Sequence, residues 1–196
     1  MRHARIPGPS PRRQNPVRRQ PAAGILLSFT AMKRHAGLHP LSQHHHFALT
    51  QALLMHRAAE APASRRAAAL RQAAEKFLSF WKKAGEQHFR EEEELLLPAY
   101  ARHTPLEQDP AVVRMLAEHA QIQGQIQQLQ TALETSPEAG LPIEEGVSTL
   151  ARALYDLIRY EENEVFPRIE RALGDAELQA LGQRLTRLHS KYSCEI

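Results

Sequence analysis

The sequence of 196 residues contains a single cysteine, Cys194. One thiol cannot form an internal disulfide, and its scarcity excludes the zinc sites that are built from several cysteines. Such sparing use of cysteine is typical of a reducing compartment, so we expect a cytoplasmic protein. Long apolar runs are also missing: none approaches the roughly 20 residues that span a bilayer, so we expect no association with a membrane.

Acidic residues are absent from the first 31 positions, which contain six arginines and five prolines. That composition disfavours helix and strand. We therefore predict a disordered, basic and proline-rich tail over residues 1–37, followed by one domain over residues 38–192. Three interpretations of the tail stay open: a basic arm for an anionic surface, a transit peptide, or an upstream extension if translation begins at Met32.

The positive charge of the whole chain comes from this tail. The formal charge is +3, from 25 basic and 22 acidic side chains, and six of the basic ones are the arginines of the tail. Without them the remainder carries a formal charge of about −3. A mildly acidic domain is a poor fit for nucleic acid, so we do not expect nucleic acid as a partner.

Strand-like alternation of polar and apolar residues is almost absent beyond residue 40, where helix-forming residues predominate. Asp109 followed by Pro110 favours a helix start, and Gly174 favours a stop. The pattern predicts helices over residues 41–60, 64–97, 110–134, 143–173 and 176–189. The second is expected to end before Pro98, and the fourth to be kinked or broken at Pro167. Four long helices with short connections favour an all-α fold, an antiparallel up-down four-helix bundle with a short C-terminal fifth helix.

Polar side chains interrupt the apolar, inward-facing stripe of each of the four long helices. The interruptions are His45, His88, Glu92, His119 and Glu161. In a bundle all five project towards the centre, where an isolated ionised carboxylate costs several kcal/mol and two carboxylates repel each other. A bound cation removes both penalties, so we predict that these five residues are metal ligands. The 11 histidines of the chain, an unusually large number, agree with this interpretation.

His88 and Glu92 stand four residues apart, which places them on one helix face, one turn from each other. Imidazole together with carboxylate is the ligand set of non-heme iron, with zinc and manganese as alternatives. The other glutamates of the run Glu91–Glu94 are expected on a solvated face. His44 points about 100° away from His45, so we expect it at the surface or at a rim.

The sequence contains an internal repeat in the second and fourth helices. Four residues recur at an offset of 69: Arg90, Glu92, Glu93 and Pro98 correspond to Arg159, Glu161, Glu162 and Pro167. The two helices are therefore interpreted as copies of one ligand-bearing element, in which Glu93 and Glu162 are candidates for orienting the ligands. The repeat fails at one position, because Leu157 stands where a counterpart of His88 is expected.

Four segments resemble the hemerythrin-like, HHE cation-binding family: LSQHHHFAL from residue 41, HFREEEELLLP from residue 88, AEH from residue 117 and IRYEENEVFP from residue 158. The resemblance extends from about Lys33 to Leu173. The second segment is very specific, since its histidine, glutamate and proline fall at the family's offsets of zero, four and ten. The resemblance implies a four-helix bundle with a non-heme di-iron centre, which in this family commonly handles dioxygen, nitric oxide or iron sensing.

Carried over position by position, the resemblance implies a role for each candidate. One iron is bound by His45 and His88, the other by His119, and the bridges are Glu92 and Glu161. Two of the family's histidines are absent, because Leu157 occupies one place and Gln123 occupies the one found in oxygen carriers. Both losses fall on the His119 side. We therefore expect one well-bound iron ion and a second position that is weak or empty.

Metal binding alone does not fix a function. The resemblance favours a metal-binding protein that senses or handles dioxygen, nitric oxide or iron, rather than an enzyme, with a small diatomic molecule or peroxide as its partner. The missing histidine argues against a reversible oxygen carrier, because such a carrier needs two irons to supply the two electrons that bind dioxygen. Two alternatives stay open: a metal-dependent oxidase or peroxide-consuming enzyme, and a bundle whose decayed site serves protein contacts. The sequence leaves the oligomeric state open.

Overall fold

The computed structural model describes residues 34–135 and 141–192, and every regular element in these ranges is a helix. For these residues the prediction of an all-α fold is confirmed. None of the described helices combines the length and the apolar character needed to cross a bilayer. Most of the predicted tail, residues 1–33, lies outside the described residues.

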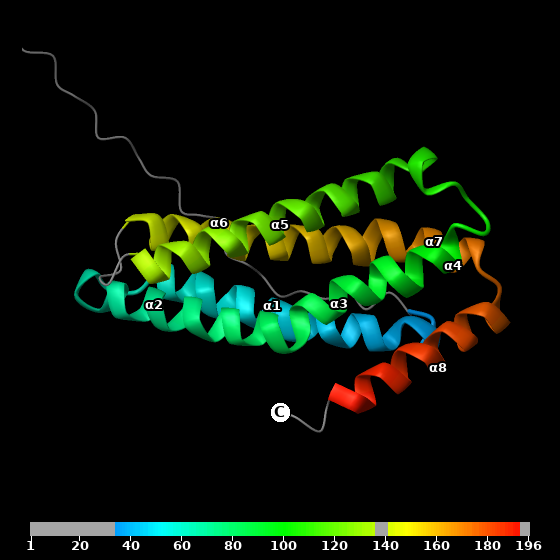
Figure 1. Ribbon diagram of the computed structural model, residues 1–196, viewed down its shortest axis with the longest axis horizontal. Coiled ribbons are helices and arrows are strands. Elements are labelled where there is room, and N and C mark those ends of the chain that lie inside the picture. Colours follow the sequence, from blue (N-terminus) through cyan, green and yellow to red (C-terminus); the bar gives the residue numbers. More distant parts are fainter. Residues whose placement is uncertain (1–33, 136–140, 193–196) are drawn as a thin grey trace, which may run out of the picture. The chain divides into compact units, whose positions relative to one another are not determined.

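The described elements follow one another with few breaks (Figure 1). They are η1 (Ala36–Leu38), α1 (His39–Ala59), α2 (Ala63–Phe80), η2 (Trp81–Gly85), α3 (Glu86–Glu91), η3 (Glu92–Leu96), α4 (Leu97–Tyr100), η4 (Leu106–Gln108), α5 (Pro110–Thr135), α6 (Leu141–Tyr160), η5 (Glu161–Val165), α7 (Phe166–Ala172) and α8 (Asp175–Tyr192). Here η1 and η4 are short 3-10 helices, whereas η2, η3 and η5 are single π-helical turns. The chain stays helical from α2 through α4, and again from α6 through α7.

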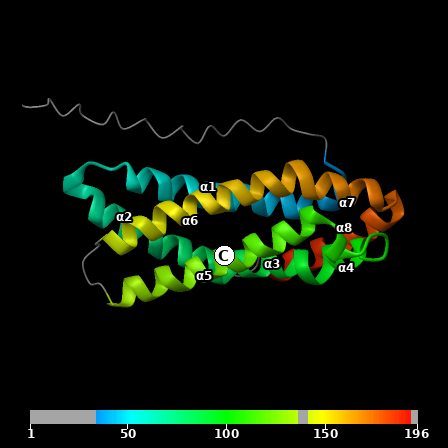
Figure 2. The ribbon, with the colours of Figure 1, turned by 90° about the horizontal axis from the view of Figure 1, so that it is seen from above.

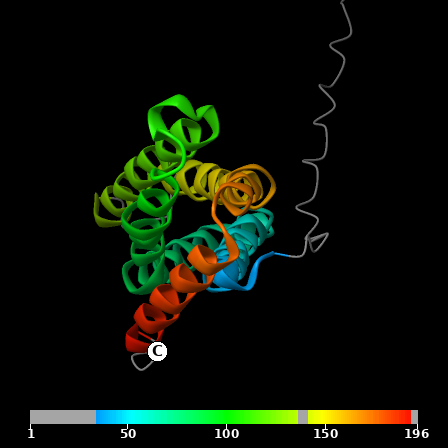
Figure 3. The ribbon, with the colours of Figure 1, turned by 90° about the vertical axis from the view of Figure 1, so that its right-hand side faces the viewer.

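The helices pack lengthwise into a helical bundle. α6 lies against both α1 and α5, and α2 lies against α1 (Figures 1 and 2). In the view along the helices, α8 lies beside the start of α1 and packs on η1 (Figure 3). The apolar stripes predicted from the sequence fill the interior, with Phe77, Met115, Ile122 and Leu154 among the buried side chains. Burial of each such side chain contributes about 1.5–3 kcal/mol, so the apolar stripes determine how each helix is rotated. The same rotation points the polar interruptions of the stripes inward.

Two prolines lie inside helical segments instead of ending them. The expected end before Pro98 is wrong, because α4 continues through it, and Pro167 does not break the fourth helix, because α7 continues through it. In both cases a π-turn, η3 or η5, directly precedes the short α-helix that contains the proline. Each proline then occupies the first turn of that α-helix, where its missing N–H and fixed φ are tolerated.

The start of α5 agrees with the sequence prediction. α5 begins at Pro110, and Oδ1 of Asp109 accepts a hydrogen bond from the N–H of Ala111 at 2.9 Å. Asp109 is buried, and its Oδ2 accepts a second hydrogen bond from the hydroxyl of Tyr100 at 2.7 Å. Asp109 therefore ties the end of α4 to the start of α5, the helix that carries His119.

Candidate metal centre

The five residues predicted as metal ligands lie together inside the bundle. His45 comes from α1, His88 from α3 and His119 from α5, while Glu92 and Glu161 are the first residues of η3 and η5. No more than 6 % of any of these residues is exposed to solvent. The neighbouring apolar residues turn them inward, because the buried stripe of each helix sets its rotation.

The two central glutamates lie between the histidines of α1 and α5. Nε2 of His45 is 3.1 Å from Oε2 of Glu161 and 3.7 Å from Oε1 of Glu92. Nε2 of His119 is 3.1 Å from Oε1 of Glu161 and 3.4 Å from Oε2 of Glu92. Each carboxylate therefore presents one oxygen to each histidine, and the centre has two sides that share the two glutamates.

The two sides differ in their number of donor atoms. On the His45 side, His88 adds a donor whose Nε2 is 3.6 Å from Oε1 of Glu92. The four donor atoms of this side, the two carboxylates included, all lie within 4.8 Å of one another, close enough to hold one metal ion. No comparable group of donors includes His119 among the described residues, and the counterpart of His88 in the sequence repeat, Leu157, is buried and has no donor atom.

Nε2 of His45 and both carboxylate oxygens of Glu92 are buried but make no hydrogen bond of good geometry within the described residues, although they face each other and their neighbours as ion pairs. Buried polar atoms in folded proteins are nearly always hydrogen-bonded, so exceptions need an explanation. Burial of an uncompensated carboxylate costs several kcal/mol. A cation held among these atoms supplies the missing partner, so the residues fit a metal ion.

The pKa values show how the centre compensates its own charges. Burial raises the pKa of Glu92 to about 7, and the neighbouring charge of Glu161 adds to this shift. Burial also acts to raise the pKa of Glu161, but His119 and His45 outweigh it and lower the value. Burial acts to lower the pKa of His119, whereas Glu161 and Glu92 raise it, to about 9. Protonated histidines therefore balance the buried carboxylates, and a cation displaces protons when it binds.

A second pair of glutamates holds two of the histidine rings. Oε1 of Glu162 accepts a hydrogen bond from Nδ1 of His45 at 2.7 Å, and Oε1 of Glu93 accepts one from Nδ1 of His119 at 2.8 Å. Each bond fixes a ring with its Nε2 aimed at the central carboxylates. Burial acts to raise the pKa of Glu162, but the bond to His45 lowers it to about 2. The structure thus places Glu93 and Glu162 where the orienting role requires them.

Arg34 supports Glu162 from the N-terminal side of the described chain. Its Nη2 is 2.9 Å from Oε2 of Glu162, and its Nη1 is 3.0 Å from Oε2 of Glu170. The guanidinium also lies over the ring of Phe166, 5.3 Å from the ring centroid. The sequence does not predict this chain of contacts from Arg34 through Glu162 to His45, because no local pattern links residues so far apart.

Both central glutamates stand at the first position of a π-turn. The N–H of Leu97 bonds to the carbonyl of Glu92, and the N–H of Phe166 bonds to the carbonyl of Glu161. Single π-turns inside α-helices are frequent at functional sites. η3 and η5 are separated by the same 69-residue offset as the sequence repeat, so the repeat extends to the backbone. Helical periodicity does not predict these turns, although a proline stands six residues after each glutamate and marks them.

Glu91 is buried, which contradicts the expectation of a solvated face for the glutamates beside Glu92. Only 1 % of Glu91 is exposed, and Nε2 of Gln87 donates a hydrogen bond to its Oε1 at 3.3 Å. Residues three apart on a helix share a face as residues four apart do, and Glu91 stands three residues after His88. The expectation is confirmed for the two glutamates that come after Glu92, which are exposed.

An open cavity of about 410 Å³ leads to the centre. Its lining includes the buried residues His88, Leu157 and Glu161 and the exposed residues Phe47 and Lys83. The cavity therefore joins the His88 side of the centre to the protein surface.

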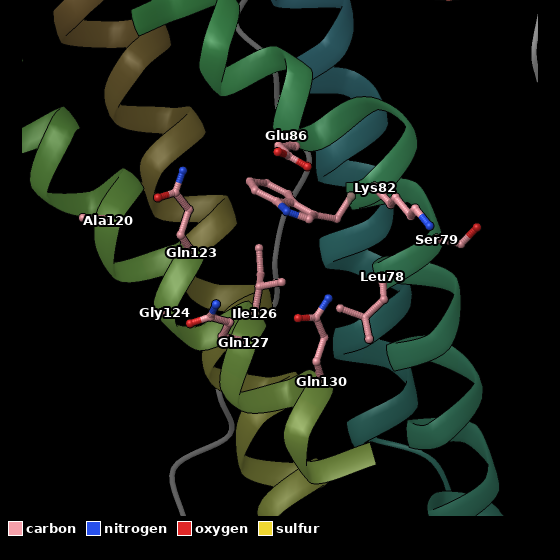
Figure 4. Close-up of a pocket in the computed structure, with 11 residues that line it drawn as sticks. Leu78, Ser79, Lys82, Glu86, Ala120, Gln123, Gly124, Ile126, Gln127 and Gln130 are labelled. Atoms are coloured by element: carbon pink, nitrogen blue, oxygen red, sulfur yellow. The ribbon is translucent and has the colours of Figure 1, made fainter. Parts of the chain in front are cut away.

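A larger groove of about 830 Å³ lies between α5 on one side and the end of α2 with η2 on the other (Figure 4). Glutamines of α5 line one side of it, and Leu78, Ser79 and Lys82 line the other. Gln123, which the resemblance aligns with a lost histidine, is exposed and belongs to this lining. The lining contains none of the five predicted ligands, so the groove is separate from the centre.

Replacing Glu162 with glutamine is expected to weaken metal binding by roughly 10- to 100-fold, although this residue supports a ligand rather than holding the ion. The amide lacks the charge that supports Nδ1–H of His45, so the ring loses basicity and orientation. Glu93→Gln should have a smaller effect, because the Glu93 side chain is 38 % exposed, against 12 % for Glu162. Competition with a chromogenic chelator measures both affinities.

Glu94→Gln is the matched control for these two variants. Glu94 is exposed and forms an ion pair with Arg90 at 3.2 Å, on the outside of the same helical segment. Its substitution should leave the metal affinity unchanged. If Glu162→Gln binds metal as tightly as Glu94→Gln does, the orienting role of Glu162 is wrong.

In a comparison with protein families, the model of the hemerythrin HHE cation-binding domain matches the chain over residues 36–189. This range contains the five predicted ligands and both orienting glutamates, and it begins just after Arg34. Neither a curated protein nor a solved structure gives a match.

Proposed function

Because the chain belongs to the hemerythrin HHE cation-binding domain family, we propose that its buried centre holds iron and that the protein senses or handles dioxygen, nitric oxide or iron. The unsatisfied atoms of the centre carry this proposal: Nε2 of His45 and both oxygens of Glu92 lie among four donors and lack a hydrogen-bond partner in the described chain. A bundle that serves protein contacts alone has no reason to bury such atoms. A decayed site is therefore the least supported alternative.

The donor chemistry of the stronger position suits iron, and it also admits zinc or manganese. His45, His88, Glu92 and Glu161 would hold this ion. The remaining carboxylate oxygens and His119 would hold a second ion more weakly, so we propose one well-bound ion and a second position that is weak or empty. When bound, iron supplies a change of oxidation state and a place for a small ligand. We also propose that the four long helices follow one another in an antiparallel, up-down order.

The cavity of about 410 Å³ supports a small partner molecule. Much of its wall is apolar, with Phe89, Leu154, Leu157 and Ile158 among the lining residues. Apolar walls with a few polar groups at one end suit a small uncharged molecule as the ligand of the bound ion. We therefore propose that a diatomic gas or peroxide reaches the centre by this route.

Consumption of peroxide is the second candidate function. The feature that favours it is the same open connection between the centre and the surface, because an enzyme must exchange substrate and product. The two functions differ in stoichiometry: a sensor reacts about once per chain, whereas an enzyme removes many equivalents of peroxide. A turnover assay with added peroxide distinguishes them.

Elemental analysis of anaerobically purified protein, followed by an absorption spectrum in air, tests the proposed function. We expect close to one iron ion per chain, and a spectrum without the strong visible bands of an oxo-bridged iron pair. Ferrous salt added to metal-free protein should restore the same content. Protein that stays empty under these conditions contradicts the proposal.

A further inference from the structure

We propose that His44, His88 and Glu91 form an outer site for a divalent cation, which receives the ion at the cavity and passes it to the buried centre. This inference rests on the proposed function of the centre, because it describes how the inner four donors are loaded. Neither His44 nor Glu91 belongs to those inner donors.

The outer residues are close enough to share an ion. Their donor atoms, one from each residue, lie within 4.8 Å of one another. Nδ1 of His44 is 3.9 Å from Oε2 of Glu91, and the rings of His44 and His88 have centroids 5.4 Å apart. The His44 side chain is 20 % exposed and lines the cavity, so the site can be reached from solvent.

Glu91 and His44 are placed so that they can share an ion. Only 1 % of Glu91 is exposed, and its Oε1 accepts a hydrogen bond from Nε2 of Gln87. The other carboxylate oxygen, Oε2, is 3.9 Å from Nδ1 of His44, a separation that one shared ion can bridge. Two imidazoles and one carboxylate bind divalent first-row metals and leave positions for water from the cavity.

His88 belongs to both sites, which gives the ion a short path between them. Its ring centroid is 5.4 Å from that of His44 and 4.8 Å from that of His45. An ion can therefore move inward by exchanging ligands around one imidazole, without crossing the apolar core. Because both sites need His88, occupation of the inner site removes a donor from the outer one.

The outer site is expected to be the weaker and transient one. It has three donors against four, and water competes at the partly exposed His44. Lys83 also lines the cavity, and its charge opposes the entry of a cation. The negative charge of Glu91 offsets this opposition, so the outer site should control the rate of loading rather than the final content.

Stopped-flow absorbance of Co²⁺ binding to the metal-free protein tests the proposal. His44→Ala should slow the appearance of the bound-cobalt spectrum at least about tenfold, with the final cobalt content and spectrum unchanged. His46→Ala is the matched control, because His46 is exposed on the same helix and belongs to neither site. Glu91→Gln should also slow loading, and thermal unfolding of the metal-free variant checks that it folds.

Two results overturn the outer site. Equal loading rates for His44→Ala, His46→Ala and the wild-type protein show that His44 does not receive the ion. A lower final cobalt content in His44→Ala assigns His44 to the inner centre instead. If the wild-type protein binds no Co²⁺ at all, the proposed function of the centre fails and the outer site fails with it, so the two failures are distinguishable.

Discussion

Replacing Glu161 with glutamine should strongly weaken metal binding on both sides of the centre. Oε2 of Glu161 faces His45 and Oε1 faces His119, each at 3.1 Å, so one substitution removes a charged donor from both positions. Loss of one partner from a buried charged pair typically costs about 3–5 kcal/mol. Since about 1.4 kcal/mol is a factor of ten in affinity, we expect metal binding to weaken by more than about 100-fold.

Metal-induced stabilisation provides the measurement. An ion present at about 1,000 times its Kd raises the free energy of unfolding by about 4 kcal/mol, so the wild-type thermal midpoint should rise clearly with added ferrous salt. With a Kd about 100-fold weaker, the same ion concentration adds only about 1.4 kcal/mol, so the rise should fall to about a third or less in Glu161→Gln. The two proteins are compared by the metal-induced rise of their thermal midpoints. The midpoints themselves differ for another reason, because the metal-free variant also loses the ion pairs of His45 and His119. Glu164→Gln, an exposed change in the same π-turn, should keep the full rise, and an equal rise in Glu161→Gln would exclude Glu161 from the centre.

The five central residues are predictable from the sequence because of helical periodicity. A polar residue that interrupts an apolar stripe lies on the same face as the stripe, which is the face that is buried. His119 is the clearest case. Met115 and Ile122 precede and follow it on the same stripe of α5, and all three are buried. The helix ranges agree within a few residues for the same reason, as α1 shows with its bounds of His39–Ala59.

Contacts between helices are less predictable, because they depend on how whole segments are rotated against each other. The hydrogen bond from His45 to Glu162 joins residues on α1 and η5, and that from Arg34 to Glu162 starts outside the helices altogether. The π-turns add to the difficulty, since each inserts a residue into the helical repeat and rotates the face of the helix after it. The burial of Glu91 was predictable, however, because residues three apart lie on the same face of a helix and Glu91 stands three residues after His88.

The sequence repeat explains why the centre has two similar sides. In each copy, one glutamate lies between the histidines and the next one holds a histidine of a facing helix. Each copy also places its first glutamate at the start of a π-turn. The copies therefore provide equivalent halves of the centre, and the unequal number of donors comes from one position, where the first copy has His88 and the second has Leu157.

Leu157→His should therefore raise the iron content from one ion per chain towards two. Leu157 is 1 % exposed and lines the cavity beside Glu161, so an imidazole at this position restores the donor that the His119 side lacks. Without metal, the buried imidazole should destabilise the protein by about 1–3 kcal/mol, because its polar atoms lose their partners in water. Iron should reverse this loss. Elemental analysis gives the iron content, and the visible bands of an oxo-bridged pair report that both ions are close together.

Leu154→His is the matched control for this gain of a ligand. Leu154 is also buried and lines the same cavity, but it lies about two turns from Glu161 along the helix. An imidazole there is too far from the shared carboxylates to complete the second position. The control should therefore lose stability without gaining iron. If the iron content stays at one in Leu157→His, or rises equally in both variants, the alignment of α6 with α3 in the two copies is wrong, and the smaller number of donors on the His119 side has another cause.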